Sequence, residues 1–113
     1  MKQLAPSILS ADFICLGEQL KQLQKLCIHY LHIDVMDGMF VPSISFGMPV
    51  IASLRKHTDM FFDVHLMIEE PIRYVNALRQ AGADGLTVHA EACADLPGTI
   101  AAIRESGAKP AVC

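Results

Sequence analysis

Short apolar runs alternate with amphipathic stretches along this chain. Apolar runs bounded by turn or charged residues are typical of buried strands, and four of them cover residues 4–9, 30–36, 61–68 and 86–89. After the first run, Leu16, Leu20, Leu23 and Cys27 recur at helical spacing and predict an amphipathic helix. Weaker patterns predict three further helices, around residues 50–54, 72–78 and 100–103.

The alternation of strands and helices repeats as one βα unit. Similar helix-to-strand turns occur at residues 81–84 and 106–109, and residues 109–113 again resemble the start of a strand. Apolar strands separated by amphipathic helices predict a parallel sheet covered by helices, which is an α/β fold. The chain is therefore expected to contain four βα units and the beginning of a fifth strand.

Two α/β architectures compete, an open doubly wound sheet and a closed eight-stranded barrel. The first strand-to-helix junction, residues 10–13, lacks the glycine-rich turn of a dinucleotide fold. Polar residues follow the carboxyl ends of several strands, where a TIM (β/α)8 barrel places its site. We therefore favour the barrel. Since a barrel typically takes about 250 residues, residues 1–113 are expected to form a single partial barrel domain, about the first half.

Composition and charge exclude several classes of protein. With 52% hydrophobic and 19% charged residues, the chain is too apolar for a disordered tail. Its longest uncharged stretch is interrupted by Pro42, Gly47 and Pro49, so no membrane span is expected. The start has no secretory apolar segment, which favours a cytoplasmic protein. The net charge of −3 and scattered basic residues argue against nucleic-acid binding. Four scattered cysteines indicate free thiols.

Candidate metal ligands occur on two predicted strands. His32 and Asp34 are two residues apart on one strand, so both side chains leave the same face of the sheet. His65 would point into the same space if its strand is adjacent and parallel. Two imidazoles and a carboxylate suit zinc or another divalent transition metal. The alternative is that these are hydrogen-bonded core or rim histidines beside a capping carboxylate.

The loops after the strands carry further polar residues. Asp37 lies three positions after Asp34, past the strand end, and we expect it to cap or brace the following loop. That loop, residues 38–49, either covers a ligand or is a packed connection. Ser7 on the first strand is a candidate hydrogen-bond donor to a substrate hydroxyl.

Other residues are placed to line a barrel mouth. Met36 and Met67 are candidates for an apolar wall, although methionine more often fills gaps in a core. His89 and Glu91 end the fourth predicted strand. No nucleophile elbow, P-loop or H-E-x-x-H motif is present, so hydrolase and nucleotide-phosphate motifs are absent.

Four segments together resemble the ribulose-phosphate 3-epimerase family. They are PSILSADF at residues 6–13, HIDVMDGMFVP at 32–42, DVHLMI at 63–68 and VHAE at 88–91. The resemblance implies a TIM barrel that interconverts D-ribulose 5-phosphate and D-xylulose 5-phosphate, with one divalent metal ion (Zn, Fe, Mn or Co). It implies an enzyme of the isomerase class and a sugar-phosphate substrate.

The resemblance also implies roles for individual residues. His32, Asp34 and His65 match three metal ligands, and Asp34 matches one of two acid/base groups. Ser7 and His65 match substrate-contacting positions, with Met36 and Met67 lining the site. The implied metal would act as a Lewis acid that stabilises the enediolate left when the proton at C3 is removed. Inversion needs a second acid on the opposite face, and in the family that aspartate and the phosphate-binding turns lie in the second half of the barrel.

Two other readings stay open. One is an epimerase for a related ketose phosphate, such as allulose 6-phosphate. The other is a non-catalytic half-barrel that binds metal or associates with a copy of itself, because a half-barrel leaves strand edges unpaired. Met39 and Ser43 depart from residues common in the family, which leaves the loop contacts open.

Overall fold

A four-stranded parallel sheet forms the centre of the molecule. The computed structural model describes all residues 1–113. The strands β1 (Tyr30–Met36), β2 (Phe61–Met67), β3 (Gly85–Val88) and β4 (Lys109–Val112) lie side by side in chain order. Every pairing is parallel, and a helix lies between successive strands in the sequence. The α/β fold expected from the sequence, about the first half of a (β/α)8 barrel, is confirmed.

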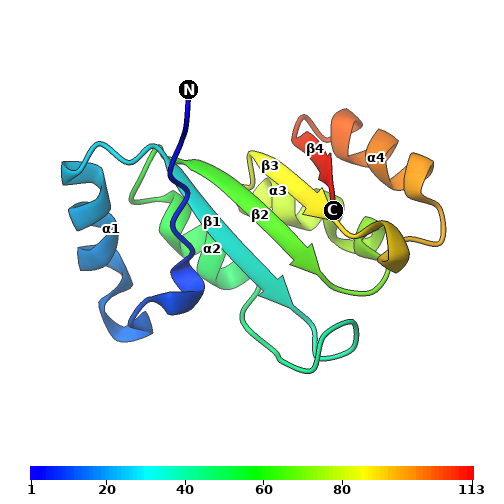
Figure 1. The fold of residues 1–113 in the computed structure, drawn as a ribbon, viewed down its shortest axis with the longest axis horizontal. Helices are drawn as coiled ribbons and strands as arrows, with labels where there is room; N and C mark the ends of the chain where they lie inside the picture. Colours follow the sequence, from blue (N-terminus) through cyan, green and yellow to red (C-terminus); the bar gives the residue numbers. More distant parts are fainter.

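Four α-helices accompany the sheet. They are α1 (Leu16–Lys25), α2 (Met48–Arg55), α3 (Val75–Ala81) and α4 (Leu96–Glu105). Short 3₁₀ helices cover Ile8–Ser10, Phe13–Cys15, Pro71–Tyr74 and Ala90–Ala92. Figure 1 shows α2 and α3 behind the sheet. Prolines lie in the first turns of α2 and α4, where a missing N–H costs nothing.

The two faces of the sheet differ in burial. Along β1 and β2 buried and half-buried residues alternate strictly. The buried set packs against the helices and forms the core, with Leu31, Ile33, Val35, Phe62, Val64 and Leu66 at its centre. The half-buried set includes the polar residues of both strands. The helix-free face of the sheet is therefore the face that presents chemistry.

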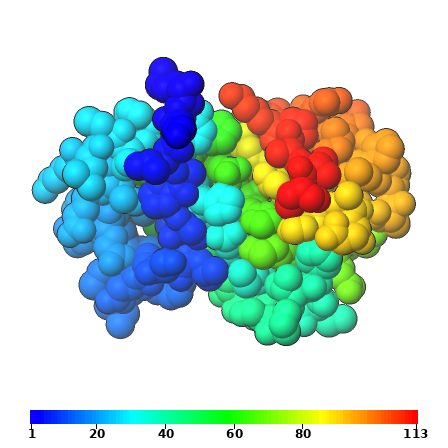
Figure 2. Space-filling model, viewed as in Figure 1, coloured from blue at the N-terminus to red at the C-terminus, as the bar shows by residue number.

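The prediction of a strand over residues 4–9 is wrong for most of this segment. Only Ser7 forms a bridge, to His32, and Ile8–Ser10 is a 3₁₀ helix. Pro6 has no N–H for a ladder, and the Ser7 hydroxyl caps the 3₁₀ helix by accepting from the Leu9 N–H at 3.1 Å. The segment still lies beside β1, since the His32 N–H donates to the Pro6 carbonyl at 2.9 Å. Figure 2 shows this N-terminal segment running along the molecule's surface.

The remaining elements follow the sequence pattern closely. The fifth predicted strand is β4, and the second helix begins at Met48, so the loop after β1 ends two residues earlier than expected. All four cysteines are free thiols. Among the helices of the structure, none has the length and apolarity needed to cross a membrane.

Candidate active site

Two neighbouring strands place the predicted metal ligands together. His32 and Asp34 share one face of β1, and Asp34 is the register partner of His65 on β2. Parallel strands in this register point both side chains to the same side. The three side chains are partly covered, with exposed fractions of 27% for His32, 13% for Asp34 and 20% for His65.

One carboxylate oxygen lies between the two imidazoles. Asp34 Oδ1 is 3.1 Å from His32 Nε2 and 3.1 Å from His65 Nδ1. The ligand atoms of all three residues lie within 4.8 Å of one another. The convergence expected from the sequence is thus present in the structure.

The other oxygen of Asp34 accepts from the N-terminal segment. The Ser7 hydroxyl donates to Asp34 Oδ2 at 2.5 Å, and its strand bridge to His32 holds Ser7 in place. Burial alone would raise the pKa of Asp34. The Ser7 hydrogen bond, followed by the charge of His32 and the contact with His65, outweighs burial and holds that pKa below its usual value.

Asp63 is a member of the site that the sequence interpretation missed. It is the register partner of His32, and its Oδ2 lies 2.9 Å from His32 Nδ1. Asp63 is two residues before His65, so the two side chains lie on the same face of β2. This spacing is the feature of the sequence that could have identified Asp63. An ionised carboxylate only accepts hydrogen bonds, so the His32 Nδ1 carries the proton and donates.

This hydrogen bond makes the site suitable for a cation. With the proton on Nδ1, a neutral His32 directs the lone pair of Nε2 at Asp34 Oδ1, which is also an acceptor. Two acceptors at this distance need a proton or a cation between them. A metal-binding histidine that donates its other N–H to a carboxylate is a common arrangement, because it fixes the ring and its tautomer.

Two methionines and a serine complete the wall around Asp34. Met36 and Met67 are register partners at the carboxyl ends of β1 and β2, on the same face as the ligands. Both are partly buried. The Ser45 hydroxyl donates to the Asp34 carbonyl at 2.8 Å and accepts from the Met36 N–H at 3.0 Å, which ties the loop to the end of β1.

Asp37 lies outside the cluster and braces the loop, as expected. Its Oδ1 accepts from the N–H groups of Met39 at 2.8 Å and Phe40 at 2.9 Å. Its Oδ2 accepts from the Glu69 N–H at 2.8 Å, on the loop after β2. Burial would raise the pKa of Asp37, but these backbone donors lower it below its usual value.

His89 comes closer to the ligands than its place in the sequence indicated. It follows β3 directly, and its Nε2 lies 2.8 Å from His65 Nε2. Glu91 is exposed, with Oε1 3.5 Å from His89 Nδ1. His65 therefore faces Asp34 with one ring nitrogen and His89 with the other.

Similarity to known proteins agrees with this geometry. Residues 3–113 match the Ribulose-phosphate 3 epimerase family. The chain is 54% identical over 112 residues to ribulose-phosphate 3-epimerase of Bacillus subtilis (strain 168), covering 99% of this chain and 52% of that protein. It is 46% identical to the Rhodobacter capsulatus enzyme of that name, covering 97% of this chain and 48% of the relative.

A plant relative covers a similar share of each chain. A ribulose-phosphate 3-epimerase from Oryza sativa subsp. japonica, named as a cytoplasmic isoform, is 44% identical over 97% of this chain and 49% of its own length. The chain thus spans about half the length of the curated relatives it matches. The match extends over nearly all of its residues, and the chain belongs to the ribulose-phosphate 3-epimerase family of isomerases.

Proposed function

We propose that this chain provides the metal-binding and proton-abstracting half of an enzyme that interconverts D-ribulose 5-phosphate and D-xylulose 5-phosphate. The observation that carries the proposal is the convergence of His32, Asp34 and His65. Family membership supplies the substrate class, because the relatives are named for this epimerisation.

The donor set fits one divalent ion of the Zn, Fe, Mn or Co type. His32 would bind through Nε2, His65 through Nδ1 and Asp34 through a carboxylate oxygen, since these atoms face one another. When bound, the ion supplies a Lewis acid for the negative charge that develops on the substrate oxygens. Asp63 holds the His32 ring in the orientation that this requires.

Asp34 is the proposed base that removes the proton at C3. Its lowered pKa keeps it ionised at neutral pH, and a carboxylate works as a base only in that form. Proton removal beside the C2 carbonyl gives an enediolate. Since inversion needs a proton from the opposite face, we place the second acid, as well as the phosphate-binding groups, outside residues 1–113.

The other site residues position the sugar. We assign Ser7 and His65 to contacts with substrate oxygens, because both reach the Asp34 carboxylate. Met36 and Met67 are assigned to the apolar wall beside the reacting carbons. Such a wall limits water at the site and strengthens its electrostatic interactions.

We propose the domain organisation, cellular location and oligomeric state of the protein on the same basis. Residues 1–113 would form one partial barrel domain of a cytoplasmic enzyme. A homo-oligomer is a further expectation for this enzyme.

A chimeric barrel tests the proposed function. Residues 1–113 are joined to the second half of the Bacillus subtilis relative, and formation of xylulose 5-phosphate from ribulose 5-phosphate is assayed with added zinc, manganese or iron. Allulose 6-phosphate serves as a competing substrate. We expect activity with the pentose phosphate, and Asp34→Asn should lower kcat about 10²- to 10⁴-fold, the usual contribution of a positioned general base.

Asp59→Asn is the matched control. Asp59 is exposed in the turn before β2 and should leave kcat unchanged. Full activity of the Asp34→Asn chimera would refute Asp34 as the base, and preference for allulose 6-phosphate would refute the proposed substrate.

A further inference from the structure

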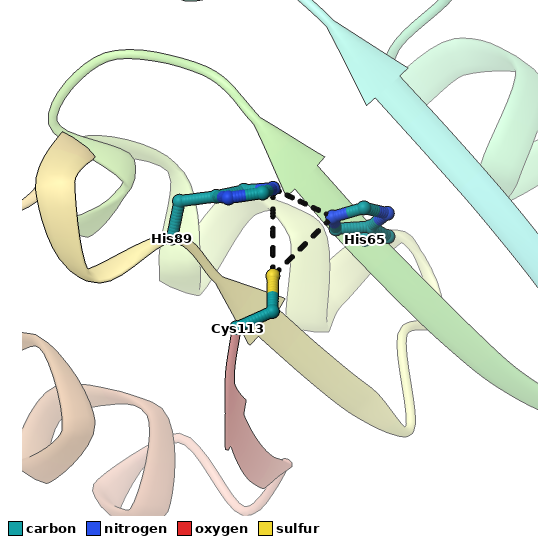
Figure 3. A group of neighbouring side chains, drawn as sticks. All are labelled: His65, His89 and Cys113. Carbon is teal, nitrogen blue, oxygen red and sulfur yellow. Dashed lines mark hydrogen bonds between the residues drawn. The ribbon is translucent and has the colours of Figure 1, made fainter.

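A second group of metal-ligating side chains lies on the same face of the sheet. His65 is on β2, His89 directly follows β3, and Cys113 directly follows β4. Figure 3 shows the three side chains pointing toward one another. His65 Nε2 lies 2.8 Å from His89 Nε2, and the Cys113 Sγ lies 3.4 Å from His89 Nε2 and 3.7 Å from His65 Nε2.

These separations resemble those of a tetrahedral zinc site. Zn–N bonds of about 2.0 Å and Zn–S bonds of about 2.3 Å place neighbouring nitrogens roughly 3.3 Å apart and nitrogen and sulfur roughly 3.6 Å apart. The two sulfur–nitrogen distances already lie within about 0.2 Å of that value. The two nitrogens need to separate by only about 0.5 Å.

The backbone holds the thiol in this position. The Cys113 N–H donates to the Val88 carbonyl at 3.0 Å, and the Cys113 carbonyl accepts from the Ala90 N–H at 3.1 Å. These bonds continue the pairing of β3 with β4 and fix Cys113 beside His89. The Phe40 ring packs on the His89 ring, with centroids 5.0 Å apart, so the imidazole is also held.

His65 is shared between the two groups. Its Nδ1 faces Asp34 and its Nε2 faces His89 and Cys113. A neutral imidazole has only one nitrogen with a free lone pair. One His65 ring therefore serves one ion at a time unless it loses its second proton.

We propose that His65, His89 and Cys113 form a second, thiolate-containing site for a borderline-soft divalent cation such as Zn²⁺. The set of two imidazoles and one thiolate favours zinc over magnesium or calcium, which prefer oxygen ligands. The site competes with the His32–Asp34–His65 group for the His65 ring. It is open on the side of Cys113, which is exposed.

Cobalt(II) titration of this chain, monitored by absorption, tests the proposal. Cobalt is the probe because thiolate ligation gives an intense ligand-to-metal charge-transfer band that nitrogen and oxygen ligands do not give. We expect this band in the native chain and its loss in both Cys113→Ser and His89→Gln. Zinc added afterwards should remove the band by displacing cobalt.

Two control variants separate this site from the proposed catalytic one. Cys15→Ser, at an exposed cysteine, and His32→Ala, which removes a ligand of the first group alone, should both retain the band. Circular dichroism of every variant establishes that the fold is kept. No band in the native chain, a band that persists in Cys113→Ser, or a band that disappears in His32→Ala would each overturn the proposal.

Discussion

The aspartates of this chain differ in role according to the groups that contact them. Asp34 is held by one hydroxyl and two imidazoles, whereas Asp37 is held by backbone N–H groups alone. In the first arrangement, Asp34 Oδ1 faces two ring nitrogens, and a cation can bind this oxygen together with those nitrogens. The second joins the loop after β1 to the loop after β2.

Replacing Asp37 with asparagine should destabilise the chain in a pH-dependent way. The folded pKa of Asp37 is lowered, so its stabilisation is present above the unfolded value and is lost as pH falls through the folded value. We expect Asp37→Asn to lower the unfolding free energy by about 1 kcal/mol at pH 7. The difference from the native chain should shrink at acidic pH, measured by urea denaturation.

Asp59→Asn provides the comparison, because Asp59 is exposed. It should match the native chain at every pH. A difference for Asp37→Asn that stays constant from pH 7 to acid would show that the carboxylate charge contributes nothing.

Sequence reasoning located some site residues and missed others for a geometric reason. His32 and Asp34 share a face because they are two apart on one strand, and that depends on the sequence alone. Asp63 contacts His32 because of the register between β1 and β2. Cys113 reaches His65 across β3, and no pattern within one segment encodes such a distance.

At the scale of elements, Arg55 joins α2 to the start of the sheet. Its guanidinium donates to Asp84 Oδ2 at 2.9 Å and to the Met60 carbonyl at 2.8 Å, and it stacks on the Phe62 ring at 3.9 Å. Asp84 in turn accepts from the Phe62 N–H at 2.9 Å. This planar, multidentate arrangement orients the α2–β2 connection at the amino end of β2.

Arg55→Lys should therefore be far from conservative. A lysine cannot reproduce the forked donation or the stacking, and we expect a loss of about 2 kcal/mol in unfolding free energy. Chemical denaturation at pH 7 measures it, with Lys56→Arg at the exposed neighbour as control. Equal stability of Arg55→Lys and the native chain would refute this role.

Two glycines offer a matched test of backbone and packing. Gly82 ends α3 with φ 122°, and a Cβ there would lie 2.5 Å from Arg55 Cδ. Gly17 in the first turn of α1 has open space around it. Gly82→Ala should lose about 1–3 kcal/mol of unfolding free energy, and Gly17→Ala should gain up to about 1 kcal/mol. Thermal unfolding that orders the two variants the other way would contradict this assignment.

The predicted strands differ in how well they match the structure. β1 matches its prediction, and buried and half-buried positions alternate over its whole length. The segment 4–9 has a similar apolar composition, yet Pro6 and the capping hydroxyl of Ser7 limit it to one bridge. The missing N–H of Pro6 and the capping hydrogen bond of Ser7 therefore prevent a full strand here.

At the scale of the whole molecule, the sheet has one covered and one uncovered face. The helices bury the apolar face, and the proposed ligands and the two methionines lie on the other. At the outer edge of the sheet, β4 pairs only with β3, and Val112 is 47% exposed. Pro110 has no N–H, so this edge lacks a hydrogen-bond donor at one position only.

We expect the isolated chain to self-associate through this edge. Sedimentation velocity should show a sedimentation coefficient that rises with protein concentration, and Val112→Lys should reduce that rise by placing a charge on the edge. Leu26→Lys, at an exposed position beyond the end of α1, is the control and should not change it. A monomer at all concentrations, with cooperative unfolding, would count against association.

Metal affinity of ligand variants tests the central claim most directly. Zinc binding to the Cys113→Ser chain is compared by calorimetry with binding to the same chain that also carries His32→Ala, Asp34→Asn or His65→Ala, so that only the first group is measured. Each ligand change should weaken binding by at least about 10- to 100-fold, since changes at supporting residues alone often cost that much. Unchanged affinity in all three variants would contradict a shared cation site at His32, Asp34 and His65.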